Sequence, residues 1–470
     1  MFDLLIKNGK YPDFDKGDFV QADIAVKDGK IAGIFPKAEG AAEAGKAPEA
    51  ARTIDASGRI VTPGFIDMHM HEEQFQGDNR EYDVSILLAK QGVTTGIAGN
   101  CGICWRPTSE FREIVENKGG CPINYVLLSG YNSLREEEGL GWYDPCPEDI
   151  RVKIVDKIRR DLDAGAWGFS FGLEYGPGIA TEEMTKAALE LKEYDPFISI
   201  HFRADCEECM NSLKEMADLS RDTGCRVEIS HIGSLAATAG NMKQSLDYVR
   251  KEIAENPKLG YDVYPYNAFC TILQSAAFDM DWRAKWGVDY DIILLLQEPF
   301  TGQRCDEALY NKLMKEYTDT YVVAFAMNEE EVKMALKEPC GLFGSDGDVA
   351  PGNDIHPRAA GCYPRILGKY VRDEKVLPLI DALDKMTRRA AARVGLTGKG
   401  EIKAGMDADI VIFDPDTIID GPEYTDTSKP NKGIDYVMVA GEPVVDHNEM
   451  TGALTGRVLD RKDYADAEQA

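Results

Sequence analysis

His69 and His71 are the residues whose type and spacing first suggest chemistry. They end the run Val61-Thr-Pro-Gly-Phe-Ile-Asp-Met-His-Met-His, an apolar segment, broken by Pro63 and Gly64, that predicts a buried strand. Because side chains alternate along a strand, residues two apart face the same side. Two imidazoles at one point favour a metal site; the alternative is a histidine pair satisfied by hydrogen bonds at a strand end. Since the chain has only six histidines, finding two of them here favours the metal.

Four more potential ligands follow other strand-like runs. These are Cys101, His201, His231 and Asp346. Thiolate, imidazole and carboxylate are ligands that suit zinc. A catalytic zinc needs only three protein ligands and a water, so six candidates leave room for two adjacent sites that share Cys101.

The elements that must position these residues alternate between strand and helix. Together with the opening strand, seven further runs read as strands, at residues 93–98, 123–128, 168–172, 197–201, 226–231, 260–264 and 341–346. Helical spacing of apolar residues appears at 150–164, 182–192, 208–223, 242–255 and 377–394. Eight alternating units predict an α/β fold of the (β/α)8 TIM-like barrel type, in which active-site residues lie at the C-terminal ends of the strands.

Both ends of the chain read as short β segments. We expect residues 1–60 and 401–470 to form one small β-sandwich domain beside a hydrolase barrel at 61–400. Asp28-Gly29 is a hairpin signal, and residues 38–51 form a low-complexity surface loop. Extra helical material at about 280–335 predicts an inserted lid over the barrel mouth.

Composition limits the classes of partner. The 470 residues are 44% apolar and carry a formal charge of −28, which disfavours nucleic acid and anionic membranes. There is no long apolar run and no leader-like start, so we expect a cytoplasmic protein with a small-molecule substrate. The eleven cysteines, an odd number, fit reduced thiols. Oligomeric state does not follow from the sequence.

The order of motifs resembles the D-aminoacylase (N-acyl-D-amino-acid deacylase) family of the amidohydrolase superfamily. The motifs are His69-x-His71, Gly99-Asn-Cys101-Gly, Gly172-Leu-Glu-Tyr-Gly-Pro-Gly178, His201-Phe-Arg203, Ser230-His231, Asp262-Val-Tyr264-Pro-Tyr266, Gly344-Ser-Asp346-Gly and His356-Pro-Arg358. The likeness covers nearly the whole chain. His-x-His alone indicates only an amidohydrolase, whereas Asn-Cys-Gly and Tyr-Pro-Tyr point to this branch.

The resemblance implies one tightly held zinc and a second, weaker position. The tight site would use Cys101, His201 and His231. The weaker site would use His69, His71, Cys101 and Asp346. The expected reaction is hydrolysis of the amide bond of an N-acyl-D-amino acid or a close analogue by metal-bound hydroxide.

Asp346 is the expected general base, accepting a proton from the water and passing it to the departing nitrogen. The alternative for Asp346 is a helix N-cap in a Ser-Asp-Gly turn. Tyr264, Arg203 and Arg358 are the candidates for holding the substrate, because an arginine fork matches a carboxylate. For each arginine, a surface ion pair is the competing interpretation.

Three positions depart from the family pattern. Gly233 stands where relatives carry a lysine, Glu73 where they carry an aspartate, and Asp205 where they carry a glutamate. Loss of the lysine removes an expected substrate contact, so D versus L preference stays open.

Other functions remain as alternatives. One is a cyclic-amide hydrolase of the hydantoinase or dihydropyrimidinase type, and another is a degenerate barrel that only binds a small molecule. Cys101-x-x-Cys104 and Cys206-x-x-Cys209 could form a structural four-cysteine zinc site, and Cys101 could be a nucleophile paired with His201. The four-cysteine site and the Cys101 nucleophile both leave histidines at strand ends without a role.

Overall fold

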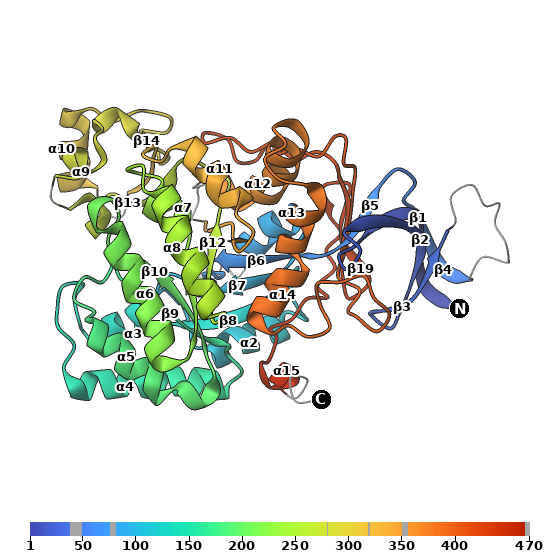
Figure 1. Cartoon of the computed structure of the whole chain (residues 1–470), viewed down its shortest axis with the longest axis horizontal. Coiled ribbons are helices and arrows are strands. Elements are labelled where there is room, and N and C mark those ends of the chain that lie inside the picture. The colour runs from blue at the N-terminus through green and yellow to red at the C-terminus, as the bar shows by residue number, and fades with distance from the viewer. Residues whose placement is uncertain (38–48, 76–80, 280, 318–319, 350–355, 466–470) are drawn as a thin grey trace.

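A computed structural model describes residues 1–37, 49–75, 81–279, 281–317, 320–349 and 356–465 (Figure 1). Its centre is a sheet of eight strands in the order β16-β12-β11-β10-β9-β8-β7-β6, whose neighbouring strands pair in parallel. These strands are β6 Phe65–Met70, β7 Val93–Ala98, β8 Asn124–Gly130, β9 Gly168–Gly172, β10 Phe197–His201, β11 Arg226–Ile229, β12 Leu259–Val263 and β16 Leu342–Phe343. All eight predicted barrel strands are therefore present.

The sheet comes close to closing between its first and last strands. Asp346 donates its backbone N–H to the His69 carbonyl at 2.7 Å, and Met70 forms a parallel bridge with Gly347. The last strand is short, so these contacts beyond its end bring the two edges together. The predicted (β/α)8 barrel is confirmed.

The opening apolar run forms two strands where the sequence analysis expected one. Ile60–Pro63 is β5 and pairs with terminal strands, whereas β6 begins at Phe65 in the barrel. The break falls at Gly64, where an added Cβ would lie 2.0 Å from Thr94 Oγ1. Glycine is therefore required where the chain passes from one sheet to the other.

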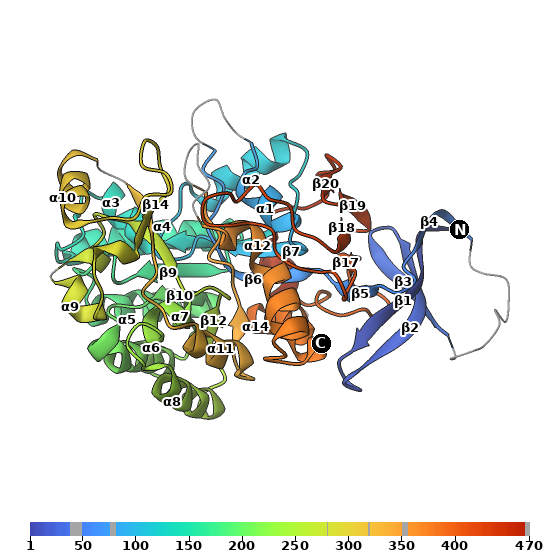
Figure 2. The same cartoon turned by 90° about the horizontal axis from the view of Figure 1, so that it is seen from above.

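Helices pack around the outside of the barrel strands (Figures 1 and 2). They are α1 Val84–Ala89, α2 Thr108–Asn117, α3 Tyr131–Glu137, α4 Glu148–Asp163, α5 Thr181–Glu190, α6 Cys209–Thr223, α7 Ile232–Ala236, α8 Met242–Glu255, α11 Glu329–Lys337, α12 Arg358–Arg365, α13 Leu379–Met386 and α14 Arg388–Val394. In α4 the buried side chains Ile154, Ile158 and Leu162 recur every four residues, so one face packs inward. The helix predicted at 377–394 divides into α13 and α14 at Thr387, because the backbone dihedral angles of Thr387 are not helical.

Strands from both chain ends build a second, nine-stranded sheet, as predicted. It contains β1 Phe2–Asp13, β2 Asp18–Lys27, β3 Lys30–Pro36, β4 Ala50–Asp55, β5, β17 Ile410–Phe413, β18 Ile434–Val439, β19 Glu442–Asp446 and β20 Glu449–Met450. Asp28 and Gly29 turn the β2–β3 hairpin with positive φ at both positions. Most of the predicted loop at 38–51 lies outside the described residues. The predicted domain boundaries stay predictions.

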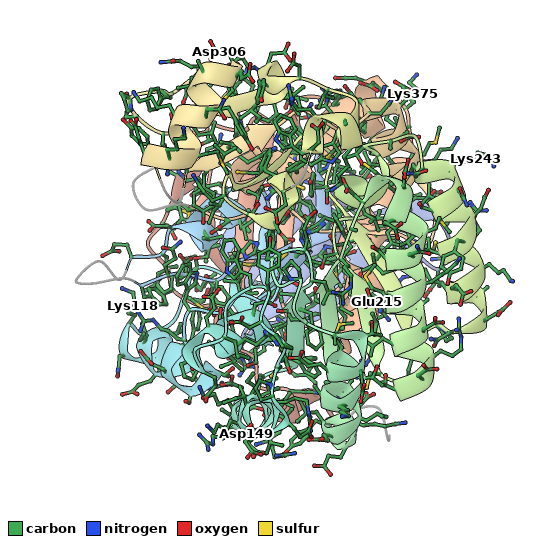
Figure 3. All side chains as sticks on the ribbon, turned by 90° about the vertical axis from the view of Figure 1, so that its left-hand side faces the viewer. Lys118, Asp149, Glu215, Lys243, Asp306 and Lys375 are labelled. Carbon is green, nitrogen blue, oxygen red and sulfur yellow. The ribbon has the colours of Figure 1, made fainter. Side chains whose placement is uncertain are left out.

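A lid lies between β12 and β16 in the chain, and we define it as residues 269–324. It contains a three-stranded antiparallel sheet of β13 Phe269–Ile272, β14 Ile293–Leu295 and β15 Tyr321–Ala324, with helices α9 Trp282–Trp286 and α10 Glu307–Glu316. Asp306, which caps α10, lies at one extreme of the molecule in Figure 3, and Asp149 of α4 lies at the other. An inserted segment is thus present between β12 and β16, but it begins with a strand at Phe269, earlier than the expected 280, and α11 Glu329–Lys337, which fell inside the expected range, packs with the barrel helices α7 and α8.

A further short helix is α15 Lys462–Ala465. Among the described residues, no helix has the length and apolarity needed to span a bilayer.

Candidate metal centre

Six strand-end side chains meet at the barrel mouth in two groups that share Cys101. One group is His69, His71, Cys101 and Asp346, and the other is Cys101, His201 and His231. Within each group the candidate ligand atoms lie within 4.8 Å of one another, and all the side chains are buried. The sequence analysis predicted this same set of six residues.

Cys101 stands at the centre of the two groups. Its Sγ lies 3.3 Å from His69 Nε2, 3.7 Å from His201 Nδ1 and 3.6 Å from His231 Nε2. His201 Nδ1 and His231 Nε2 are 2.9 Å apart. Asp346 Oδ1 lies 3.3 Å from His71 Nε2. One sulfur can therefore belong to both groups.

The outward-facing ring nitrogens of three histidines already have partners. His201 Nε2 lies 3.1 Å from Glu174 Oε2, and His69 Nδ1 lies 3.3 Å from Asp262 Oδ2, so both nitrogens carry the proton that a carboxylate accepts. Ser234 Oγ lies 2.8 Å from His231 Nδ1 and donates to the His231 carbonyl, so it accepts from the ring.

In the neutral rings the opposite nitrogens of these three histidines offer lone pairs, and they face one another and Cys101 Sγ. Buried acceptors that face acceptors are costly unless a donor or a cation lies between them. Zinc is usually held by sulfur and nitrogen ligands, and the outer ring nitrogen of each histidine ligand is usually hydrogen-bonded in this way. The residues present fit a divalent metal ion.

The backbone at this centre is strained in three places. Cys101, His231 and Asp346 adopt φ values of 56°, 34° and 51°, in the left-handed region that non-glycine residues rarely occupy. Such conformations cluster at functional sites, where the surrounding structure enforces them. Each of the three turns its side chain sharply after a strand, which directs the ligand atom into the mouth.

Charge at the site favours the ionised forms of its acids. Burial opposes ionisation of Cys101, but without a metal the charge on His69 and the ring N–H groups of His201 and His231 hold the pKa of the thiol well below its ordinary value of 9.0, and a bound cation would take the place of those ring protons. Burial likewise opposes ionisation of Asp346, and Arg358 and His69 hold the pKa of that carboxyl well below 3.8. Thiolate and carboxylate are the forms that bind a metal.

A cavity of about 300 Å³ opens beside the six residues. Barrel loops and the lid both line it, the lid contributing Phe269, Cys270, Thr271, Ile272, Ser275, Ala277, Trp286 and Tyr321. The metal side of the cavity is polar, and the lid side is largely aromatic and apolar. The cavity can therefore hold a small molecule with one polar and one apolar end.

The three predicted substrate residues have different surroundings. Arg358 and Tyr264 line the cavity, with the guanidinium 4.9 Å from the tyrosine ring centre and 2.8 Å from Asp346 Oδ2. Arg203 forms a forked ion pair with Glu215, which lies on the outer helix α6 (Figure 3). Among the described residues, Arg203 is not part of the cavity wall.

The three departures from the family pattern have local explanations. An added Cβ on Gly233 would lie 3.0 Å from the Met327 methyl carbon, so methionine occupies the adjoining space. Glu73 accepts hydrogen bonds from the backbone N–H groups of Asp83, Val84 and Ser85 and thereby caps α1. Asp205 accepts a hydrogen bond from the lid residue Trp286 at 2.8 Å.

Several residues around the centre were missed by the sequence analysis. Glu174, Ser234 and Asp262 hold the outer ring nitrogens of the histidines. Glu174 and Asp262 lie in motifs that the sequence analysis named, and an acidic side chain within two residues of a strand end was the available signal. Among the described residues, no four-cysteine cluster forms, and all eleven cysteines are free.

His356 also lines the cavity, but its ring has protein partners on both sides. Nε2 faces the Ala268 carbonyl at 3.2 Å, and Nδ1 accepts the Arg358 backbone N–H at 3.0 Å. His447 is exposed beside Asp446 in the terminal sheet. Neither histidine belongs to the metal groups.

A (β/α)8 barrel with two clusters of metal ligands at the strand ends defines a metal-dependent hydrolase of the amidohydrolase type. Comparison with known proteins agrees. The family model described as "Amidohydrolase family" matches residues 52–117 and 183–445. The chain belongs to the amidohydrolase family.

Curated relatives align over nearly the whole chain. A D-aminoacylase of Alcaligenes xylosoxydans xylosoxydans is 29% identical, with 98% of each chain covered. An N-acyl-D-glutamate deacylase of the same organism is 30% identical, with 93% of each covered. An N-acyl-D-aspartate deacylase, again of that organism, is 29% identical over 97% of this chain and 95% of its own.

Solved structures show the same likeness. A D-aminoacylase with a binuclear metal centre, in which one metal activates and the second attenuates, has a TM-score of 0.86 at 27% identity, covering 98% of this chain and all of its own. The N-acyl-D-glutamate deacylase of Bordetella bronchiseptica, bound to zinc and a phosphonate inhibitor, has a TM-score of 0.84 at 27% identity, with 98% and 99% covered. An L-hydantoinase of Arthrobacter aurescens, at 19% identity and a TM-score of 0.63, shares the fold.

Proposed function

We propose that this protein is a zinc-dependent deacylase that hydrolyses the linear amide of N-acyl-D-amino acids or close analogues. The observation that carries the proposal is the convergence of three imidazole lone pairs, a thiol and a carboxylate at one barrel mouth. Its full-length relatives are deacylases of N-acyl-D-amino acids. The free cysteines and the acidic charge fit a cytoplasmic enzyme that does not bind nucleic acid.

We assign a tight zinc site to Cys101, His201 and His231, and a weaker one to His69, His71, Cys101 and Asp346. A bound zinc ion would act as a Lewis acid toward water and the scissile carbonyl. The sulfur and nitrogen donors of the first set suit zinc well. Asp346 in the second set is already paired with Arg358, which weakens its hold on a second cation.

Asp346 is the proposed general base. Its Oδ2 lies 2.8 Å from Arg358 Nη1, which fixes the carboxylate and keeps it ionised. Its Oδ1 stays on the side of the metal ligands, 3.3 Å from His71 Nε2. A carboxylate held there can accept a proton from the attacking water and deliver it to the leaving amine nitrogen.

Arg358 and Tyr264 are the proposed contacts for the substrate α-carboxylate. Arg358 Nη1 is buried and, despite its closeness to Asp346, makes no well-aligned hydrogen bond among the described residues. A buried donor of this kind is costly unless a ligand accepts from it. The guanidinium stacks over the Tyr264 ring, which fixes its orientation.

The substrate side chain is proposed to be uncharged and bulky. The lid wall offers Phe269, Ile272 and Trp286, and Trp105 and Trp142 complete the mouth. Among the described lining residues, Arg358 is the only lysine or arginine, against five acidic residues. An acidic substrate side chain would lie against apolar lid residues and near acidic residues of the cavity wall, so its binding is disfavoured.

The test combines metal analysis with a substrate panel. Purified protein is loaded with zinc and assayed against N-acetyl-D-phenylalanine, N-acetyl-L-phenylalanine, N-acetyl-D-glutamate and a hydantoin. We expect hydrolysis of the first compound and little of the others. Preferential ring opening of the hydantoin would replace this proposal with a cyclic-amide hydrolase, and metal binding without any turnover would favour a small-molecule-binding barrel.

A further inference from the structure

The lid meets the barrel strand ends through two consecutive residues, Lys285 and Trp286 of α9. Trp286 donates its Nε1–H to Asp205 Oδ2 at 2.8 Å, and Lys285 forms an ion pair with Oδ1 of the same carboxylate. Asp205 is buried and lies four residues after His201. One barrel carboxylate therefore receives both lid side chains.

Lys285 also faces a second carboxylate. Its Nζ lies 4.0 Å from Glu174 Oε1, and the other oxygen of Glu174 lies 3.1 Å from His201 Nε2. The four side chains form a line from Asp205 through Lys285 and Glu174 to His201. Within the part of the chain that the structure describes, no other lysine or arginine lies within ion-pair distance of Glu174 or Asp205.

The charge balance of these four side chains depends on the lid, because the lid residue Lys285 supplies the ammonium group. Asp205 and Glu174 are both buried, and the Lys285 ammonium group lies between their carboxylates. The ammonium group between them offsets both charges. Glu174 accepts from the His201 Nε2–H, and this hydrogen bond keeps His201 Nδ1 directed at Cys101.

Lys285 is tied to the lid core. The Trp286 ring packs against Phe269, Phe278 and Trp282 with ring centres 5.4 to 5.5 Å apart, and the Lys285 ammonium lies 5.4 Å from the Trp286 ring centre. Movement of the lid would therefore withdraw the ammonium group from both carboxylates together.

We propose that Lys285 is a positioning residue that couples the seated lid to the metal centre. Through Glu174 it fixes the orientation of His201, and through Asp205 it holds α9 on the barrel. The inference rests on the proposed function, because it takes His201 to be a metal ligand.

The test measures metal binding directly in the full-length protein. Lys285→Met is titrated with cobalt(II), following the thiolate absorption, and with zinc in competition with a chelator. Loss of a residue that hydrogen-bonds a metal ligand changes metal affinity by about 10- to 100-fold. Lys285 acts on Glu174 and not on His201 itself, so we expect Lys285→Met to bind metal about three- to tenfold more weakly. Lys285→Arg should restore most of the affinity, because it keeps the charge.

Lys315→Met is the matched control. Lys315 is an exposed lysine on α10 of the same lid. This variant should bind both metals as the wild type does. Hydrogen exchange of residues 282–286 should speed up in Lys285→Met and not in the control, since Lys285 forms an ion pair with the barrel residue Asp205, whereas Lys315 is exposed on α10.

A double-mutant cycle tests the route through Glu174. Glu174→Gln retains an acceptor for His201 and removes the charge that faces Lys285. If Lys285 acts through Glu174, adding Lys285→Met to Glu174→Gln weakens metal binding no further. Fully additive losses would overturn the proposed route.

The failures of the two proposals are distinguishable. If the wild type binds zinc and Lys285→Met binds it equally well, the coupling is wrong and the deacylase proposal stands. If the wild type binds neither zinc nor cobalt, the deacylase proposal fails and the coupling falls with it.

Discussion

Two buried polar clusters of this chain differ in how their charges are satisfied. At the junction between the terminal sheet and the barrel, Lys399 Nζ lies 2.8 Å from Asp407 and 2.5 Å from Asp409. Asp409 also accepts hydrogen bonds from Asn124 and from the Ala440 N–H. At the barrel mouth, by contrast, lone pairs of three imidazoles face one another and Cys101.

The difference separates a structural cluster from a functional one. At the junction every carboxylate has a cation or a donor, so the cluster is complete without a ligand and serves to hold two sheets together. At the mouth the outer nitrogens are satisfied and the inner ones are not, so a cation completes it. Substitutions at the junction should therefore affect folding, and substitutions at the mouth should affect metal binding and turnover.

The largest effect is expected for Asp346→Asn. Loss of the general base should lower kcat by about 10²- to 10⁴-fold. The tight site does not include Asp346, so zinc content should stay near the wild-type value. Steady-state kinetics and elemental analysis of the same preparation check both points. Near-normal turnover would show that Asp346 is not the base.

Lys399→Met should act on stability alone. It leaves Asp407 and Asp409 buried with less positive charge, and breaking a buried pair costs about 3–5 kcal/mol. Urea unfolding measures the loss, and zinc affinity of the folded fraction should be unchanged. A variant as stable as the wild type would mean that the junction is not maintained by this charge.

Cys101→Ser should weaken zinc binding and leave the stability of the metal-free protein unchanged. Losing a sulfur ligand should weaken zinc binding by more than the roughly 100-fold seen for outer partners. Chelator competition measures the affinity, and the free energy of unfolding of the chelator-treated protein serves as the control, since it should change little. Unaltered zinc affinity would exclude Cys101 as a ligand.

Arg358→Lys should raise KM for N-acyl-D-amino acids. A lysine keeps the charge and loses the planar fork, and a hydrogen bond to a charged group contributes about 1.5–3 kcal/mol, so we expect an increase of about tenfold or more. Kinetics with an N-acyl amine that lacks the carboxylate provide the control, because its KM should not change. An equal rise for both compounds would contradict a carboxylate contact.

Arg203→Met should have the smallest effect. Arg203 is paired with Glu215 and is partly exposed, so its contribution is that of a surface ion pair, at most about 1 kcal/mol. We expect kcat and KM within about twofold of the wild type. A large rise in KM would restore Arg203 as a substrate contact.

The strand-end residues could be predicted because two regularities act together. Alternation along β6 and into the residue after it places His69 and His71 on one side, and the parallel barrel brings the ends of distant strands to one mouth. Cys101, His201, His231 and Asp346 each end or follow a clear apolar run. Local pattern and tertiary rule agree at these positions, so the sequence alone indicated which side chains converge.

Other features depend on tertiary contacts that no local pattern records. The pairing of Arg203 with Glu215 and of Lys285 with Asp205 joins segments whose approach follows only from the packing of the lid and outer helices. At Gly64 the chain passes from one sheet to the other, but in the sequence residues 61–71 have the pattern of one continuous strand. The apolar strands of the lid were not distinguishable from helix by short-range spacing.

Zinc-edge X-ray absorption of the full-length protein with one equivalent of zinc tests the central claim most directly. The account predicts a first shell of one sulfur at about 2.3 Å and two imidazole nitrogens near 2.0 Å, completed by a lighter ligand. A shell without sulfur, or one that is unchanged in Cys101→Ser, would contradict it.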